Sequence, residues 1–137
     1  MDSGLRMLCN SRYVPAGRGE LDNHGIHQFD CWGFVMAVFD YFGVTVPDYT
    51  EHPDNYSLVA KLYESASVSP LWERIESPEV PCLVAMATVM PKVCNHFGVY
   101  LGNGVFVHVQ KKNGVHTARI DAAPWAKFVH SFWRFVG

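Results

Sequence analysis

The sequence predicts an α+β domain in which N-terminal helices pack on an antiparallel sheet. Three observations lead to this fold class: an apolar helical segment lies early in the chain, alternating segments separated by tight turns fill the second half, and no linker divides them. With 137 residues, of which 49% are hydrophobic, the chain can bury one substantial core. We therefore expect a single domain over residues 1–137.

A loop-rich segment is expected up to Gly25, and the strongest helix signal follows it. Asp30 is a typical N-cap residue, residues 32–42 are apolar apart from one aspartate, and Gly43 is a typical helix-ending residue. Because this helix has no polar face, it should be buried in the middle of the domain. Residues 57–66 repeat apolar side chains at helical spacing and predict a second, amphipathic helix.

The second half of the chain predicts antiparallel strands, because short apolar or alternating segments follow one another between turn residues. Asn113 and Gly114 form a strong tight-turn signal between two of them. The predicted strands cover residues 72–76, 83–89, 96–109 as a hairpin around Gly102–Gly104, 115–120 and 128–136. This order places the buried helix against the sheet.

Cys31 falls in the first turn of the predicted helix. The unpaired backbone N–H groups and the positive end of the helix dipole favour a thiolate there, which makes a cysteine a competent nucleophile. Gly33 leaves the turn without a bulky side chain, so a substrate carbonyl could approach. A single cysteine also fits a plain structural role as a small buried hydrophobe.

His96 and His108 lie on either side of Gly102-Asn103-Gly104 in the predicted hairpin. If these three residues form the loop, Gly98 faces His108 and both histidines point to one side as diagonal neighbours, about 7–8 Å apart at the backbone. A two-residue loop would shift the pairing by one residue and send the histidines to opposite faces. The longer loop would therefore supply a base and a base-orienting group for the cysteine.

The sequence Asp-Cys-Trp-Gly-Phe-Val at residues 30–35, with His-Phe-Gly-Val-Tyr-Leu-Gly-Asn-Gly-Val-Phe-Val-His at residues 96–108, resembles the motifs of the NlpC-type cysteine peptidases. These are papain-like enzymes that cut the stem peptides of bacterial peptidoglycan, and the resemblance runs from Tyr13 to Arg134. It implies an NlpC-type papain-like fold and cleavage of an amide bond in the stem peptide, with the bond after D-glutamate favoured. It implies no cofactor.

Carried over position by position, the resemblance implies that Cys31 is the nucleophile, His96 the base, and His108 the third polar member that orients His96. Tyr13 matches an upstream tyrosine that lies near the substrate in the family and helps to polarise its carbonyl.

Asp30, Trp32 and Gly33 flank the nucleophile and are expected to belong to the substrate-binding side. The commonest family form has serine directly after the cysteine, where it helps to bind the free amino end of the stem peptide, whereas this chain has Trp32. We expect Trp32 to line the groove, with burial under the neighbouring loop as the alternative, and we do not expect recognition of an unsubstituted N-terminal L-Ala. The tryptophan form and the ending 131–135 are similar to the phage-tail branch, so phage tail proteins are expected partners beside the peptidoglycan stem peptide.

Other polar and aromatic residues have simpler explanations. Cys31, Cys94, His96 and His108 could in principle form a four-ligand zinc site, but the hairpin and the helix-start cysteine are explained without metal, so no metal site is expected. The widely spaced cysteines predict reduced thiols. Structural, packing or solvated-turn roles are expected for the remaining histidines, for Trp72, Trp125 and Trp133, and for the pair Lys111–Lys112.

Charge and the amino-terminal sequence narrow the expected location. The formal net charge of −2 leaves no broad basic surface, so nucleic acid is not an expected partner. Residues 1–8 contain an early acid and no long apolar stretch, so neither a secretory signal nor a membrane span is expected. We expect a protein made in the cytoplasm without a signal peptide, incorporated in a phage tail and acting at the cell wall. The alternatives are a tail-tip assembly or wall-binding part with little activity, and a thiol acyltransferase.

Overall fold

The structure, a computed structural model, describes residues 2–49, 70–89, 93–112 and 114–137. Its helices in these ranges are α1 (Ser3–Cys9), α2 (Cys31–Tyr41) and α4 (Trp125–Phe128). Its strands are β1 (Arg12–Tyr13), β2 (Arg18–Leu21), β3 (His27–Phe29), β4 (Trp72–Ile75), β5 (Leu83–Met86), β6 (His96–Gly102), β7 (Val105–Gln110), β8 (Gly114–Arg119) and β9 (Val129–Phe135). The helix predicted over residues 57–66 lies outside the described residues.

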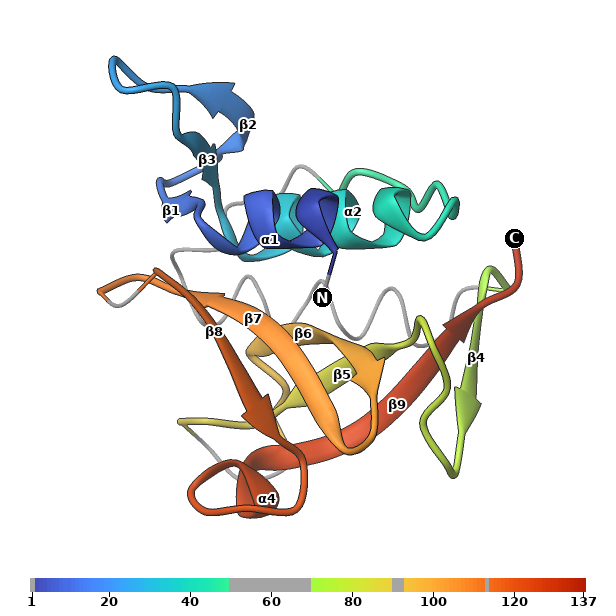
Figure 1. Cartoon of the computed structure of the whole chain (residues 1–137). Coiled ribbons are helices and arrows are strands. Elements are labelled where there is room, and N and C mark those ends of the chain that lie inside the picture. The colour runs from blue at the N-terminus through green and yellow to red at the C-terminus, as the bar shows by residue number, and fades with distance from the viewer. Residues whose placement is uncertain (1, 50–69, 90–92, 113) are drawn as a thin grey trace.

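The main sheet has the strand order β4-β9-β5-β6-β7-β8, and every pair in it is antiparallel. Helices α1 and α2 lie along one side of this sheet, and the short helix α4 lies at its other side (Figure 1). A second, three-stranded sheet with the order β1-β3-β2 projects beyond the start of α2. The predicted α+β class, with N-terminal helices on an antiparallel sheet, is confirmed.

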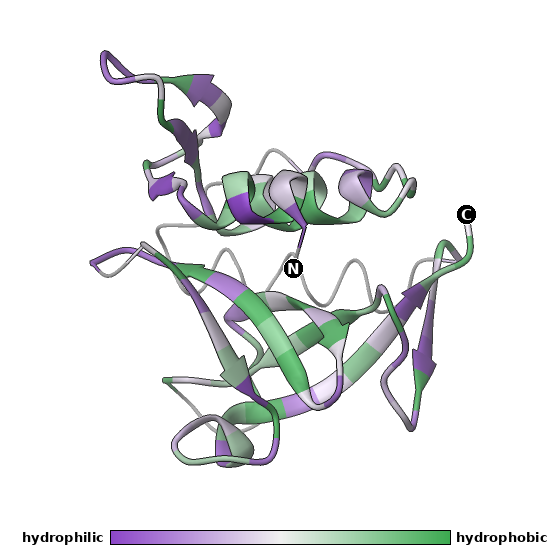
Figure 2. Cartoon of the chain, viewed as in Figure 1, coloured by the Kyte–Doolittle hydropathy of each residue, from purple (hydrophilic) through white to green (hydrophobic). Residues whose placement is uncertain are grey.

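The sheet buries apolar side chains on both faces, in two separate clusters. Strand alternation points Phe97, Val99 and Val107 toward α2, where they join the larger cluster. Val84, Met86 and Phe106 point the other way and pack with residues of α4 and β9. Apolar residues accordingly dominate α2 and the central strands, whereas the small sheet is more hydrophilic (Figure 2).

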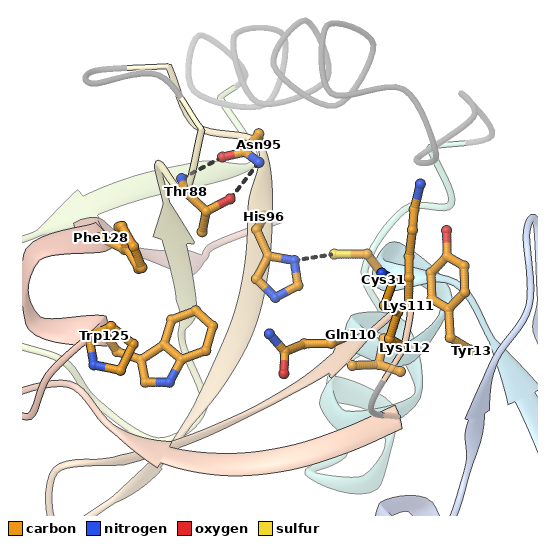
Figure 3. A pocket seen from close by; sticks show the side chains of 12 residues that line it. Tyr13, Cys31, Thr88, Asn95, His96, Gln110, Lys111, Lys112, Trp125 and Phe128 are labelled. Carbon is orange, nitrogen blue, oxygen red and sulfur yellow. Dashed lines mark hydrogen bonds between the residues drawn. The ribbon is translucent and has the colours of Figure 1, made fainter.

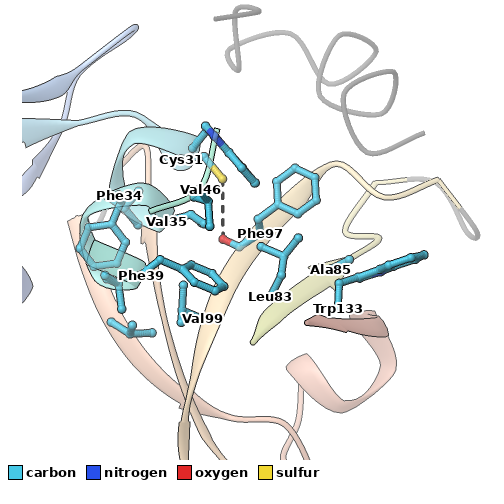
Figure 4. Close-up of a cluster of buried hydrophobic side chains, with 14 of the residues drawn as sticks. Cys31, Phe34, Val35, Phe39, Val46, Leu83, Ala85, Phe97, Val99 and Trp133 are labelled. Carbon is cyan, nitrogen blue, oxygen red and sulfur yellow. Dashed lines mark hydrogen bonds between the residues drawn. The ribbon is translucent and has the colours of Figure 1, made fainter. Parts of the chain in front are cut away.

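Helix α2 is the buried helix that the sequence predicts. The carboxylate of Asp30 accepts a hydrogen bond from the Gly33 amide at 2.6 Å, which caps the helix start. Its fully buried side chains from residues 34 to 39 pack on β6 and neighbouring strands (Figure 4). The helix ends before Gly43, which has a φ of 81°.

The segment before α2 is more regular than the predicted loop. Asp2 caps α1 by accepting a hydrogen bond from the Leu5 amide at 3.0 Å, and Leu5 is buried against the larger cluster. Helix α1 has seven residues, and strands β1 to β3 have two to four residues each. Elements this short do not show a hydrophobic periodicity, so the sequence pattern alone did not indicate them.

The β6–β7 hairpin combines a short turn with a bulge. Asn103 and Gly104 form a two-residue turn with φ values of 54° and 80°, and Gly102 pairs with Val105. The prediction of a three-residue loop is therefore wrong. A register shift between Tyr100 and Gly102 inserts Leu101 as an extra residue, so beyond it Val99 pairs with Val107. The bulge restores the register that the longer loop was expected to give, and both histidines lie on the same face.

Candidate active site

Cys31 is the first residue of α2, and its sulfur faces the start of β6. The Sγ atom lies 3.7 Å from Nδ1 of His96 and 3.7 Å from the carbonyl oxygen of Phe97. Figure 3 shows the contact with His96, and Figure 4 shows the contact with Phe97 at the edge of the larger cluster. Only 7% of Cys31 is exposed, so the thiol is nearly enclosed.

His96 and His108 form a direct side-chain pair across the hairpin. Nε2 of His96 lies 2.7 Å from Nδ1 of His108, which joins the three side chains in the order Cys31, His96, His108. His108 is fully buried, and its ring meets the Trp125 ring edge to face with centroids 4.5 Å apart. The geometry expected from the register is present, and it fixes the orientation of the His96 ring.

The hydrogen bond between the two rings decides whether His96 can accept a proton from sulfur. When Nε2–H of His96 donates to Nδ1 of His108, Nδ1 of His96 keeps a lone pair that faces Cys31. His108 then carries its proton on Nε2, a buried atom without a hydrogen-bond partner among the described residues. This tautomer makes His96 a base toward the thiol.

Burial favours the neutral form of all three groups. It raises the pKa of the Cys31 thiol to about 12, and it lowers the pKa of His96 to about 4 and that of His108 to about 3. The helix start favours a thiolate, but the desolvation of a nearly enclosed sulfur is the larger effect. The expected resting thiolate is therefore not what the structure favours: without substrate, a neutral thiol lies beside a neutral imidazole.

A cavity of about 480 Å³ opens beside the cysteine and His96. Figure 3 shows aromatic side chains at one end, the cysteine–histidine contact in the middle, and Tyr13 with two lysines at the other end. The residues that line it include Pro124, Trp125 and Phe128, then Cys31, His96 and Asn95, and then Tyr13, Lys111 and Lys112. One end of the cavity is therefore apolar and the other is basic.

Asn95 holds the chain just before His96. Its amide oxygen accepts a hydrogen bond from the Thr88 amide at 2.7 Å, and its nitrogen donates to the Thr88 hydroxyl at 2.7 Å. Asn95 is buried, with 4% exposed, and it lines the cavity. These two bonds tie the start of β6 to the end of β5 and limit the movement of His96.

Tyr13 lies in the cavity, but the other residues predicted on the substrate side do not. Asp30 is fully buried, caps α2 and lies 2.6 Å from the guanidinium of Arg18. Its charge is matched within the protein, so Asp30 serves the fold. A side chain at Gly33 would lie 2.2 Å from the carbonyl oxygen of Gly17. The space expected for a substrate carbonyl is thus filled by backbone.

Trp32 is buried and does not line the cavity. Its indole N–H donates to the carbonyl oxygen of Pro47 at 2.9 Å, and its ring packs against Tyr49, Trp72 and Phe97. The expectation that Trp32 lines the groove is wrong, and the alternative, burial under the neighbouring loop, is correct. A large aromatic ring on the inner face of a buried helix gains more from apolar contact than from exposure.

Sequence reasoning missed most residues that line the cavity, and Trp125, Lys111 and Lys112 are three of them. Trp125 was expected only to pack, but it lines the cavity and contacts both histidine rings. Lys111 and Lys112 are exposed, as expected for a turn, and they also line the cavity. No local pattern marks these residues, because only the pairing of β7 with β8 and the position of α4 bring them to Cys31.

Two further properties of the described residues concern metal binding and membrane spanning. No group of three or more His, Cys, Asp or Glu there has the geometry to hold a metal ion. Within the same residues, no helix is long and apolar enough to cross a membrane.

A helix-start cysteine beside a histidine at the start of a strand, in an α+β fold, defines a papain-like protein. The model of the NlpC/P60 family matches residues 11–134. The chain therefore belongs to the NlpC/P60 family. Curated proteins include no significant sequence match.

Solved structures share the fold at low sequence identity. NlpC2 from Trichomonas vaginalis is 19% identical with a TM-score of 0.62, and the match covers 96% of this chain and 43% of that chain. The NlpC/p60 domain of the peptidoglycan hydrolase SagA is 16% identical with a TM-score of 0.53, covering 98% of this chain and 94% of the domain. The peptidoglycan hydrolase RipB from Mycobacterium tuberculosis is 20% identical with a TM-score of 0.51, covering 97% and 63%. The chain spans less than half the length of several matched structures, 32% to 43%.

Proposed function

We propose that this chain is a cysteine peptidase that hydrolyses an amide bond in peptidoglycan stem peptides. The observation that carries the proposal is the continuous series of contacts from Cys31 Sγ to His96 at 3.7 Å and from His96 to His108 at 2.7 Å, next to a cavity of about 480 Å³. Membership of the NlpC/P60 family supports the substrate class, as does the description of SagA and RipB as peptidoglycan hydrolases.

The first step is attack by Cys31. Because burial favours the neutral thiol, its proton passes to Nδ1 of His96 as the sulfur forms a bond to the substrate carbonyl carbon. The carbonyl oxygen then carries a negative charge. At the helix start Asp30 already binds the Gly33 amide, so the Cys31 amide and the Tyr13 hydroxyl are the donors that we assign to this oxygen.

The second step breaks the amide bond. His96, now protonated on Nδ1, gives this proton to the leaving nitrogen, and the carbon–nitrogen bond breaks to leave a thioester on Cys31. Water then attacks the thioester while His96 takes one of its protons, and the sulfur leaves and recovers a proton as the thiol. Each cycle returns Cys31 and His96 to their neutral forms.

His108 is a positioning residue. It does not reach the sulfur, and its fully buried ring is held against Trp125. Its bond to Nε2 keeps the His96 lone pair directed at Cys31 and stabilises the charge that His96 gains during attack.

The finer substrate assignment concerns the amino end of the stem peptide. In this chain Asp30 is paired with Arg18 and Trp32 is buried, so neither position presents a group to a free amino terminus. We therefore assign cleavage in stem peptides that are still attached to glycan, as well as in free ones. The bond after D-glutamate is the one that the family resemblance favours.

The test is digestion of intact sacculi and of defined stem peptides, with mass spectrometry of the products. Wild type should release peptides, Cys31→Ala should release none while it remains folded, and Cys82→Ala should serve as a matched control for a buried cysteine away from His96. His108→Gln should lower kcat by about 100-fold without abolishing turnover, since a positioned base contributes about 10²–10⁴-fold. Turnover by Cys31→Ala equal to wild type would reject Cys31 as the nucleophile.

Association with a phage tail, with action at the cell wall, is a further part of the proposal. Its support is the sequence Asp-Cys-Trp at residues 30–32 and the sequence Ser-Phe-Trp-Arg-Phe at residues 131–135. Detection of the chain in purified tails by mass spectrometry would test it. If the chain is found there and wild type cleaves no wall peptide, the assembly role is favoured.

A further inference from the structure

A second cavity adjoins the one at Cys31. Its volume is about 440 Å³, and it shares Tyr13, Lys111 and Lys112 with the first. Arg12 lines only the second cavity. The two cavities therefore adjoin at Tyr13, Lys111 and Lys112, on the basic side of Cys31, and together they are called the groove.

The described charged side chains that line this groove are all positive. Three cations line the second cavity, and among the described residues no carboxylate lines either cavity. The whole chain has a formal net charge of −2, so this concentration of positive charge is a local property. Ser11 also lines the second cavity, and its buried hydroxyl has no hydrogen-bond partner in the described part of the chain. A groove with several donors and no acceptor charge fits an anionic group.

We propose that Arg12, Lys111 and Lys112, which we name the basic groove, bind a free carboxylate of the peptide substrate next to the scissile bond. This inference rests on the proposed function and specifies its substrate. A glutamyl residue joined through one carboxyl group keeps its other carboxyl group as a free anion close to that bond. The aromatic end of the first cavity offers no such partner, so the groove also sets the direction in which the peptide lies across Cys31.

The experiment compares two peptides that differ only in this carboxylate, free in one and amidated in the other. Hydrolysis gives kcat/KM for wild type, and binding to Cys31→Ala gives Kd without turnover. Wild type should prefer the free acid, and Lys111→Gln with Lys112→Gln should reduce that preference by about 5- to 20-fold, because each exposed charge pair contributes about 2- to 5-fold. The preference should also shrink when salt rises from about 0.05 M to about 0.5 M.

Two matched controls remove charge elsewhere. Lys127→Gln on α4 and Arg74→Gln on β4 change exposed cations outside the basic groove, and both should keep the wild-type preference. Arg12→Gln, compared with Arg74→Gln, should lower the preference on its own.

The outcomes separate the two proposals. If wild type hydrolyses neither peptide while Cys31→Ala still binds the acid more tightly than the amide, the peptidase proposal fails and the basic groove stands. Equal kcat/KM and equal Kd for acid and amide would overturn the basic groove, and so would a preference that survives the double lysine variant. Absence of binding of either peptide to Cys31→Ala would overturn it too.

Discussion

Lowering the pH from about 7.5 to about 5 is expected to remove about 4 kcal/mol of folding stability through His96 and His108. Burial lowers their pKa values from 6.5 to about 4 and about 3. Below pH 6.5 the unfolded chain binds protons that the folded chain does not, so stability that is fully present above this pH is lost as the pH falls. At about 1.5 units below 6.5, each histidine accounts for about 2 kcal/mol, since one unit corresponds to about 1.4 kcal/mol.

Urea unfolding followed by tryptophan fluorescence measures this loss, at constant ionic strength and several pH values. His108→Gln should reduce the pH-dependent loss by about half, because one of the two buried imidazoles is removed. His24 is exposed in the turn before β3, so His24→Gln should leave the loss unchanged. Burial also lowers the pKa of the half-buried His130. This histidine is present in both variants and adds the same pH-dependent loss of stability to each.

The exposed carboxylates of Asp2 and Asp121 cannot produce the same slope. Hydrogen bonds and neighbouring charges lower the pKa values of Asp2 and Asp121 below their ordinary range, so these groups titrate at a lower pH than the window of the measurement. A free energy of unfolding that is equal at about pH 7.5 and about pH 5 would refute the reasoning. An unchanged pH dependence in His108→Gln would do the same.

Three further predictions concern residues around α2. Gly33→Ala should destabilise the fold by about 1–3 kcal/mol, seen as a lower Tm, because its Cβ would lie 2.2 Å from the Gly17 carbonyl oxygen; an unchanged Tm would contradict this close packing. Trp32→Phe should cost about 1–3 kcal/mol, because the Pro47 carbonyl loses its donor, yet leave KM unchanged; a raised KM would show that Trp32 touches substrate. Alkylation of Cys31 by iodoacetamide should accelerate continuously up to about pH 9, because burial raises its pKa to about 12; a plateau near neutrality would reveal a resting thiolate.

The sequence predicted those helices and strands that are long enough to show a clear hydrophobic pattern. Helix α2 is apolar all round, and the cap at Asp30 and the stop at Gly43 follow known preferences, so its bounds were expected almost to the residue. It was also predictable that His96 and His108 lie on the same face of the sheet, because only one register of the hairpin allows their rings to meet.

The remaining features depend on tertiary contacts that no local pattern encodes. The expected three-residue loop was wrong because a bulge at Leu101 and a two-residue turn produce the same register as one longer loop. Trp32 was placed in the groove because it neighbours the nucleophile in sequence, but a helix turns by about 100° per residue, and this rotation points it into the core. Trp125 reaches the histidines through the position of α4.

The two faces of the main sheet hold different halves of the candidate site. Cys31 is fixed by the cluster that packs α2 on the sheet, whereas His108 and Trp125 belong with the cluster on the opposite face, and His96 bridges the two at the start of β6. A small change of side-chain volume in either cluster would move one half relative to the other by tenths of an ångström. Substitutions in the protein interior can therefore tune the distance between sulfur and imidazole without any change in the residues that line the cavity.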